Sequence, residues 1–265
     1  MSAGELLIIG GNEEKYEGLS ILQTFADLAM KRGGKVGILP AASRVPDEIS
    51  SIYKDTFTKL GIHDSITLSI SSREKADSLE LNDSLEKISA LFITGGNQSL
   101  LAERISGTTF HDSLLRRWKE GMILAGTSAG ASIMGKEMIV SSKLKLHDDT
   151  LKVYMGKGFG FLEDLIIDQH FSQRGRFGRL IGAMAEMPGM IGIGIDENTA
   201  ILLKDNEFEV IGEHQVFIVD GQEGEVFRPD VPEESSELTA TNFKLHTLKA
   251  GFRFNLINKS VIHSK

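Results

Sequence analysis

The stretch that decides the fold is Met122-Ile123-Leu124-Ala125-Gly126-Thr127-Ser128-Ala129-Gly130. Its first four residues form a continuous apolar run, which is typical of a strand buried on both faces of a parallel sheet. The small residues on either side of Ser128 then allow a tight turn into a helix. We therefore predict that Ser128 lies at the carboxyl end of a buried strand.

Similar apolar runs occur elsewhere in the N-terminal half, at residues 6–9, 36–39 and 90–93. Apolar residues with helical spacing lie between these runs, in segments near 18–29, 46–60 and 114–118. Strands that alternate with helices indicate βαβ units with right-handed crossovers. The expected fold is an α/β fold with a doubly wound, mostly parallel sheet flanked by helices.

The pattern continues with predicted strands at 165–167 and 191–195 and a helix at 176–187. The residues that follow favour antiparallel strands, and we predict a C-terminal hairpin of 200–203 and 208–211 around a turn at 204–206. A further strand is expected at 215–219, an exposed acidic loop at 229–236, and a tail or edge strand within 251–265. We expect residues 1–265 to form a single α/β domain.

Composition excludes several classes of protein. The chain has 265 residues, a net charge of -8 and no cysteine. The acidic balance argues against nucleic acid or an anionic membrane as a partner. The absence of cysteine excludes disulfides, thiolate zinc sites and a cysteine nucleophile. With no secretory signal and no apolar run of membrane length, we expect a cytoplasmic protein. No residue spacing predicts a metal site or a dinucleotide loop, so no cofactor is expected.

Ser128 is the leading candidate for chemistry. At the N-terminus of a helix, backbone N–H groups and the helix dipole favour negative charge, and the N–H of Ala129 could donate to an oxyanion. The alternative is that Ser128 only caps the helix. The buried strand before it favours a nucleophile.

A serine nucleophile needs a base and an acid that orients the base. His170 directly follows the predicted strand at 165–167, where residues line the ligand crevice of an open α/β sheet. His147, in a polar loop, is the rival. Either Asp196 or Glu197, after the strand at 191–195, could be the acid. The chain order Ser, His, acid differs from the α/β-hydrolase order.

Two further segments point to binding. Gly95-Gly96-Asn97-Gln98 follows a buried strand, and its free N–H groups near Gly96 could complete an oxyanion hole. Gln173-Arg174-Gly175-Arg176-Phe177-Gly178-Arg179 is a basic cluster in an acidic protein. It predicts either a clamp for an acidic substrate or a solvated helix face.

Together these segments resemble the cyanophycinases of the S51 serine peptidases over about residues 4–220. The resemblance is carried by residues 92–98, 126–131, 168–180 and 194–200, and 168–180 is the most specific string. It implies a class I glutamine-amidotransferase-like fold and a triad of Ser128, His170 and Glu197. It also implies a substrate pocket formed by Gln98, Asp168, Gln169, Arg174, Arg176 and Arg179.

The resemblance implies exopeptidase cleavage of cyanophycin, a poly-aspartate chain with arginine on each β-carboxyl, to β-Asp-Arg dipeptides. It also implies a homodimer. The alternatives are an α-aspartyl dipeptidase, which shares the serine turn, and a non-catalytic binding protein on the same scaffold.

Overall fold

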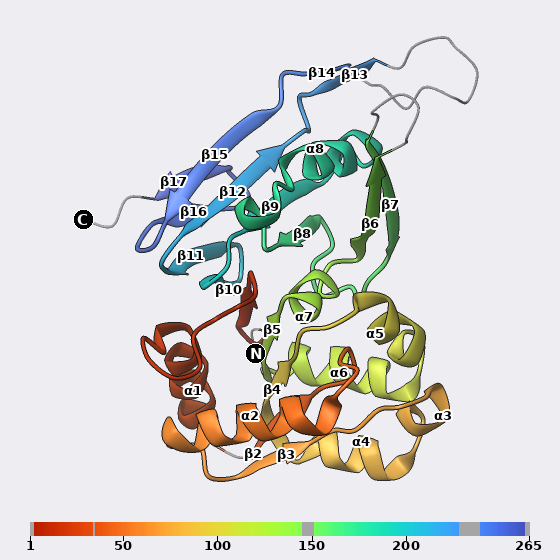
Figure 1. The fold of residues 1–265 in the computed structure, drawn as a ribbon, viewed down its shortest axis with the longest axis vertical. Helices are drawn as coiled ribbons and strands as arrows, with labels where there is room; N and C mark the ends of the chain where they lie inside the picture. The colour runs from red at the N-terminus through yellow and green to blue at the C-terminus, as the bar shows by residue number, and fades with distance from the viewer. Residues whose placement is uncertain (1–2, 34, 145–150, 228–238, 263–265) are drawn as a thin grey trace.

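The computed structural model describes residues 3–33, 35–144, 151–227 and 239–262. Figure 1 shows two regions: helices α1–α6 gather around one part of a central sheet, and a second sheet with helix α8 lies at the other end. The helices are α1 (Ser20–Arg32), α2 (Pro46–Lys59), α3 (Arg73–Ala76), α4 (Leu79–Glu86), α5 (Gln98–Ile105), α6 (Thr109–Lys119), α7 (Ala129–Ser132) and α8 (Phe177–Glu186).

The central sheet combines a parallel and an antiparallel part. Its order is β17 (Ser260–Ile262), β16 (Arg253–Asn255), β11 (Glu207–Gly212), β10 (Thr199–Lys204), β1 (Leu6–Ile9), β5 (Ile123–Thr127), β4 (Ile88–Ile93), β2 (Lys35–Leu39) and β3 (Ser65–Thr67). Neighbouring strands in the part β1-β5-β4-β2-β3 pair in parallel, whereas β10 pairs with β1 in antiparallel fashion. The predicted α/β fold, with a large central sheet flanked by helices, is confirmed.

Helices cover both faces of this sheet because alternate strand residues point to opposite sides. Leu7 and Ile9 of β1 pack in one cluster with α1 and α2. Leu6 and Ile8 pack in a second cluster with α4, α5 and α6. The continuous apolar runs of the sequence are therefore strands with two buried faces.

The strands predicted at 165–167 and 191–195 do form, but they leave the central sheet. They belong to a second sheet in the order β15 (Lys244–Lys249), β12 (Gln215–Asp220), β9 (Ile191–Ile195) and β8 (Leu165–Gln169). The physical reason is that β10 occupies the edge beside β1. One face of the second sheet joins the core of the central sheet through Ile167 and Ile193, and α8 covers the other face.

The C-terminal hairpin is confirmed as β10 and β11, and it extends the central sheet. Within residues 251–262, β16 and β17 extend the central sheet further, and β17 is its edge strand. Two pairs stand outside both sheets: β6 (Glu137–Leu144) with β7 (Leu151–Lys157), and β13 (Glu225–Phe227) with β14 (Thr239–Thr241). His147 and the loop predicted at 229–236 lie outside the described residues. No helix in the described ranges has the length and apolarity needed to cross a membrane.

Candidate active site

Ser128 occupies a strained turn between β5 and α7. Its backbone angles are φ 54° and ψ -112°, a region that residues other than glycine rarely adopt. A Cβ on Gly126 would lie 2.2 Å from the carbonyl oxygen of Gly130, so this turn tolerates no side chain there. The Ser128 side chain makes no capping hydrogen bond to α7. The capping alternative therefore does not describe this serine.

Ser128, His170 and Glu197 form one chain of hydrogen bonds. Ser128 Oγ lies 2.9 Å from His170 Nε2, and His170 Nδ1 lies 2.5 Å from Glu197 Oε1. With Nδ1–H donated to the carboxylate, Nε2 is left to accept the serine proton. His170 comes directly after β8, and Glu197 comes two residues after β9.

The second acid of the pair faces elsewhere. Asp196 is buried, its Oδ1 accepts from the N–H of Ser172 at 2.9 Å, and its Oδ2 accepts from the N–H of Gln215 at 3.3 Å. These contacts tie the end of β9 to its neighbours. Of the two acids that residue patterns left open, Glu197 is the one that contacts the imidazole.

Burial and charge set the protonation of this chain. Burial lowers the pKa of His170 below its usual value and outweighs the opposing effect of the hydrogen bond that His170 donates to Glu197. The positive charge of Arg174 lowers this pKa further. The hydrogen bond with His170 lowers the pKa of Glu197. At neutral pH the imidazole is therefore neutral and the carboxylate is charged, which is the state that a general base requires.

The predicted oxyanion donors lie beside the serine. A Cβ on Gly95 would lie 3.3 Å from the Cβ of Ser128, and a Cβ on Gly96, where φ is +142°, would lie 2.1 Å from the carbonyl oxygen of Ala42. Gly95 and Gly96 line the same cavity as Ser128, and the position of Gly96 has no room for a side chain. Ala129 begins α7 and is buried directly after the nucleophile candidate.

The Arg-rich string divides into two kinds of arginine. Arg179 and Arg176 both bind the carboxylate of Asp168, which has 0% exposure. The bond from Arg179 Nε to Asp168 Oδ2 is 2.7 Å long. Burial lowers the pKa of Arg176 to about 10, which leaves it charged at neutral pH. Arg174, in contrast, is exposed and lines the cavity in front of Ser128.

The two predicted glutamines lie differently. Gln98 starts α5, and its side-chain amide donates to the carbonyl oxygen of Ile139 at 2.9 Å, which fixes it against β6. Gln169 is buried, with Oε1 3.5 Å from Ser128 Oγ. Of the six residues predicted for the pocket, only Arg174 lines this cavity.

Sequence reasoning missed the loop after β1. Asn12 donates from its side chain to Glu197 Oε2 at 3.1 Å. Glu13, only 3% exposed, accepts a hydrogen bond from the hydroxyl of Thr127 at 2.5 Å and another from the hydroxyl of Tyr53. Burial, together with the charge of Glu13, raises the pKa of Tyr53, so its hydroxyl stays protonated and donates. The available signal was Gly10-Gly11-Asn12, which follows β1 as Gly95-Gly96-Asn97 follows β4.

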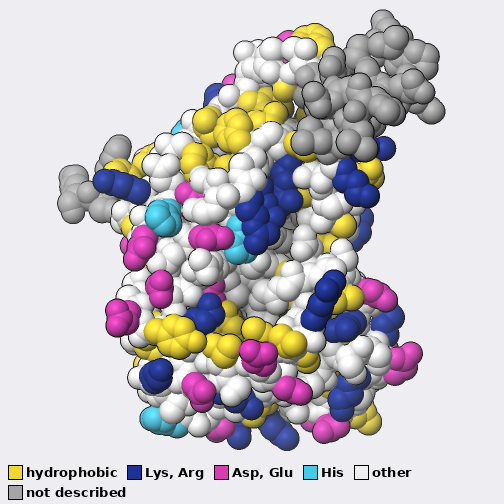
Figure 2. All heavy atoms as spheres, in the orientation of Figure 1, with side chains coloured by type: hydrophobic (Ala, Val, Ile, Leu, Met, Phe, Trp, Pro, Cys, Tyr) yellow, Lys and Arg dark blue, Asp and Glu magenta, His cyan; other side chains and the backbone are white. Residues whose placement is uncertain are grey.

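These residues surround a cavity of about 580 Å³ that opens at Ser128. Its walls carry opposite charges, Arg174 and Lys15 against Glu13 and Glu197. Figure 2 shows Lys and Arg side chains gathered on this face over the region of α8, beside a hollow. Among the described residues, no group of three or more His, Asp or Glu side chains could hold a metal ion.

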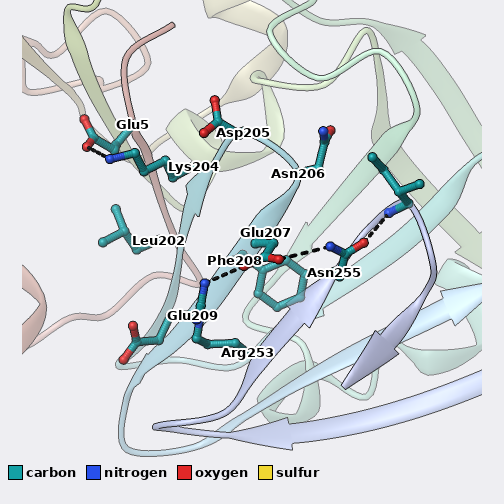
Figure 3. Close-up of a pocket in the computed structure, with 11 residues that line it drawn as sticks. Glu5, Leu202, Lys204, Asp205, Asn206, Glu207, Phe208, Glu209, Arg253 and Asn255 are labelled. Atoms are coloured by element: carbon teal, nitrogen blue, oxygen red, sulfur yellow. Dashed lines mark hydrogen bonds and ion pairs between the residues drawn. The ribbon is translucent and has the colours of Figure 1, made fainter. Parts of the chain in front are cut away.

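A larger cavity of about 650 Å³ lies at the other end of β10, around the turn to β11 (Figure 3). Four of its charged side chains pair with one another, Lys204 with Glu5 and Arg253 with Glu207. It contains no nucleophile and base in contact. We therefore assign the chemistry to the smaller cavity at Ser128.

Comparison with known proteins identifies the group to which the chain belongs. The model of peptidase family S51 matches residues 6–211. The chain belongs to this family. It is a serine peptidase, and the resemblance that the sequence motifs predict is confirmed.

Curated relatives extend the match over almost the whole chain. A cyanophycinase of Trichormus variabilis is 38% identical over 97% of this chain and 87% of its own length. A cyanophycinase of Geminocystis herdmanii is 36% identical over 94% of this chain and 93% of its own.

Solved structures share the fold at lower identity. A peptidase from an acI-B1 Actinobacterium has a TM-score of 0.71 at 22% identity, covering 96% of this chain and 97% of its own. A putative peptidase E from Listeria monocytogenes has a TM-score of 0.53 at 17% identity, covering 80% of this chain and 100% of its own.

Proposed function

We propose that this S51 peptidase hydrolyses cyanophycin by acyl transfer through Ser128, His170 and Glu197, and that it releases β-Asp-Arg dipeptides from the polymer. The observation that carries the proposal is the unbroken hydrogen-bonded chain from Ser128 Oγ through the imidazole to Glu197 Oε1, with steps of 2.9 and 2.5 Å. Support for the substrate comes from relatives named cyanophycinase at 33–38% identity.

The proposed reaction has two halves. His170 Nε2 takes the proton of Ser128 Oγ as the oxygen attacks the scissile carbonyl carbon, and the developing oxyanion accepts hydrogen bonds from the N–H groups of Gly96 and Ala129. The imidazolium then gives its proton to the leaving amine as the C–N bond breaks. In the second half, His170 takes a proton from the water that attacks the acyl carbon and returns it to Ser128 Oγ as the acyl–oxygen bond breaks; Glu197 stabilises the imidazolium in both halves.

The charged walls of the cavity fit a substrate that carries both signs. Cyanophycin presents carboxylates and guanidinium groups. Relatives of this chain are named cyanophycinase. Among the residues that the structure describes, none makes a hydrogen bond or ion pair with the guanidinium of Arg174, whose backbone N–H donates to His170 O, so the guanidinium is available to a carboxylate. Arg176 and Arg179, in contrast, are held by Asp168.

The test is product analysis with matched variants. Purified protein is incubated with cyanophycin and, separately, with Asp-Leu, and the products are identified by mass spectrometry. We expect β-Asp-Arg from cyanophycin, no turnover with Ser128→Ala, and full turnover with Ser51→Ala on the exposed side of α2. Cleavage of Asp-Leu alone indicates an α-aspartyl dipeptidase, and no cleavage of either substrate contradicts the proposed substrate.

We also propose that the chain acts as one hydrolytic domain, in the cytoplasm, as a homodimer without a nucleic-acid partner. Light scattering on the purified protein tests the dimer. A molar mass of 29.0 kDa, that of one chain, would contradict it.

A further inference from the structure

The loop at residues 10–14, which follows β1 and is here named the β1 loop, contacts the residues that follow three other strands. Ile9 of β1 lies beside Thr127 of β5 in the parallel register. The β1 loop therefore begins next to Ser128. From there it reaches the ends of β8 and β9, which belong to the other sheet.

Two glycines of the β1 loop fit against His170. The carbonyl oxygen of Gly10 accepts from the backbone N–H of His170 at 2.8 Å. A Cβ on Gly11, where φ is +99°, would lie 2.4 Å from His170 Cε1 and 2.5 Å from Nε2. The backbone of Gly11 thus forms the surface on which the imidazole rests.

Asn12 holds the oxygen of Glu197 that faces away from the imidazole. Its side-chain N–H donates to Oε2 at 3.1 Å, while Oε1 accepts from His170. Asn12 adopts a left-handed φ of 48°, which asparagine tolerates better than most residues. The backbone around the acid is tied as well, since the N–H of Asn198 donates to Gly11 O at 2.9 Å.

Glu13 holds the residue before the nucleophile. Its carboxylate accepts from the Thr127 hydroxyl at 2.5 Å and from the Tyr53 hydroxyl, and Lys15 Nζ lies 3.4 Å from Oε1. A buried carboxylate is costly unless it is paired and hydrogen-bonded. The ion pair with Lys15 and the two hydrogen bonds offset that cost, and they hold the Glu13 carboxylate against Thr127, the residue before Ser128.

We propose that the β1 loop is the positioning element of the active site: Asn12 fixes the carboxylate of Glu197 and Glu13 fixes the turn that presents Ser128. This inference rests on the proposed function for its reaction, but the contacts themselves do not. Neither residue exchanges a proton with substrate, so both act through the triad. Strain supports this role, because four of the seven described non-glycine residues with positive φ are Asn12, Ser128, His170 and Asn198.

The first test uses matched substitutions of Thr127. Thr127→Val keeps the shape and removes the hydroxyl, whereas Thr127→Ser keeps the hydroxyl. We expect Thr127→Val to lower kcat on cyanophycin about 10- to 100-fold, the range for losing a hydrogen bond to a charged group, with KM within about twofold. Thr127→Ser should retain most of kcat. Equal losses in the two variants would overturn the role of Glu13, and so would an unchanged kcat in Thr127→Val.

If Thr127→Val does not fold, Tyr53→Phe removes the other hydroxyl from Glu13 and is measured in the same way. We expect its kcat to fall while KM is retained. An unchanged kcat in folded Tyr53→Phe would overturn the role of Glu13.

The second test needs no substrate. Asn12→Asp places a second carboxylate against Glu197, and the added negative charge stabilises the imidazolium. We expect the pKa of His170, followed by NMR of its ring, to rise by about one unit. In Asn12→Gly, which accepts the positive φ without an amide, the rise should be absent while kcat still falls.

If Asn12→Asp leaves the pKa of His170 unchanged and Asn12→Gly keeps its kcat, Asn12 does not hold Glu197. If the wild-type protein leaves cyanophycin intact, the proposed function fails, and the NMR titration still decides whether the β1 loop holds the acid.

Discussion

The two kinds of arginine in the 173–179 string should respond differently to removal. Arg179 is 11% exposed in its side chain and binds Asp168, which has 0% exposure. Removing one partner of a buried ion pair costs about 3–5 kcal/mol because the other charge is left in the core. Without Arg179, Asp168 Oδ1 still accepts hydrogen bonds from Arg176 at 3.3 Å and from the backbone N–H of Gln169 at 2.9 Å. We therefore expect Arg179→Ala to lose about 3 kcal/mol, at the low end of that range.

The assay is thermal unfolding followed by circular dichroism. For a chain of this size, about 3 kcal/mol corresponds to a fall in Tm of about 6–12 °C. Arg174→Ala is the matched control, because an exposed substitution without lost partners changes stability by only about 0.5 kcal/mol. Its kcat/KM on cyanophycin should instead fall about 10- to 100-fold. Arg174 also lowers the pKa of His170, so kcat/KM is compared near pH 8, where the base is neutral in both proteins.

An Arg179→Ala protein with the wild-type Tm would refute this reasoning, and so would an Arg174→Ala protein that loses stability but keeps its kcat/KM. A double variant sharpens the test. Asp168→Asn with Arg179→Ala removes the buried charge together with its partner, and it should recover part of the lost Tm. If the arginines of residues 173–179 instead all bind the substrate, both single variants should lose activity and neither should lose stability.

Three further predictions concern the triad. Because burial lowers the pKa of His170 and only the neutral imidazole accepts the serine proton, kcat/KM should rise with pH through a midpoint below the usual value of about 6.5; a midpoint above 7 in a pH–rate profile would contradict this. Gly11→Ala should lower kcat at least about 100-fold because its Cβ displaces the imidazole, whereas Gly18→Ala, with φ +63° and no atom within 4 Å, controls for backbone strain alone. Glu197→Gln should lower kcat by about a thousandfold or more with an unchanged circular dichroism spectrum; a loss under tenfold would remove the carboxylate from the mechanism.

Local patterns predicted the strands and the residues at their ends well. The apolar run before Ser128 is β5, and the strand before His170 is β8. A two-residue alternation or an apolar run depends only on which faces of a strand are buried, so it can be read from the chain. The same signal does not say which sheet a strand joins. That depends on the edge beside β1, which a strand from much later in the chain occupies.

The sequence could not separate residues that line the cavity from residues in buried ion pairs, because it does not show which side chains contact one another. The Arg-rich string does not reveal that Asp168, eleven residues before Arg179, is buried among these side chains. Glu13 was missed for the same reason. In the sequence it is one of several charged residues after Gly-Gly-Asn, and only the parallel register of β1 with β5 brings it to Thr127.

The assembly of the site across two sheets explains why the β1 loop carries so many contacts. Ser128 stands at the end of a central-sheet strand, while His170 and Glu197 follow strands of the second sheet. A shift of one sheet against the other by about 1 Å would break the geometry that proton transfer needs. Apolar packing between the sheets is non-directional and does not fix such a shift on its own. Hydrogen bonds are directional, and those of the β1 loop run to both sheets, from Glu13 to Thr127 and from Asn12 to Glu197. The register between the nucleophile and its base therefore depends on these polar contacts as well as on the core.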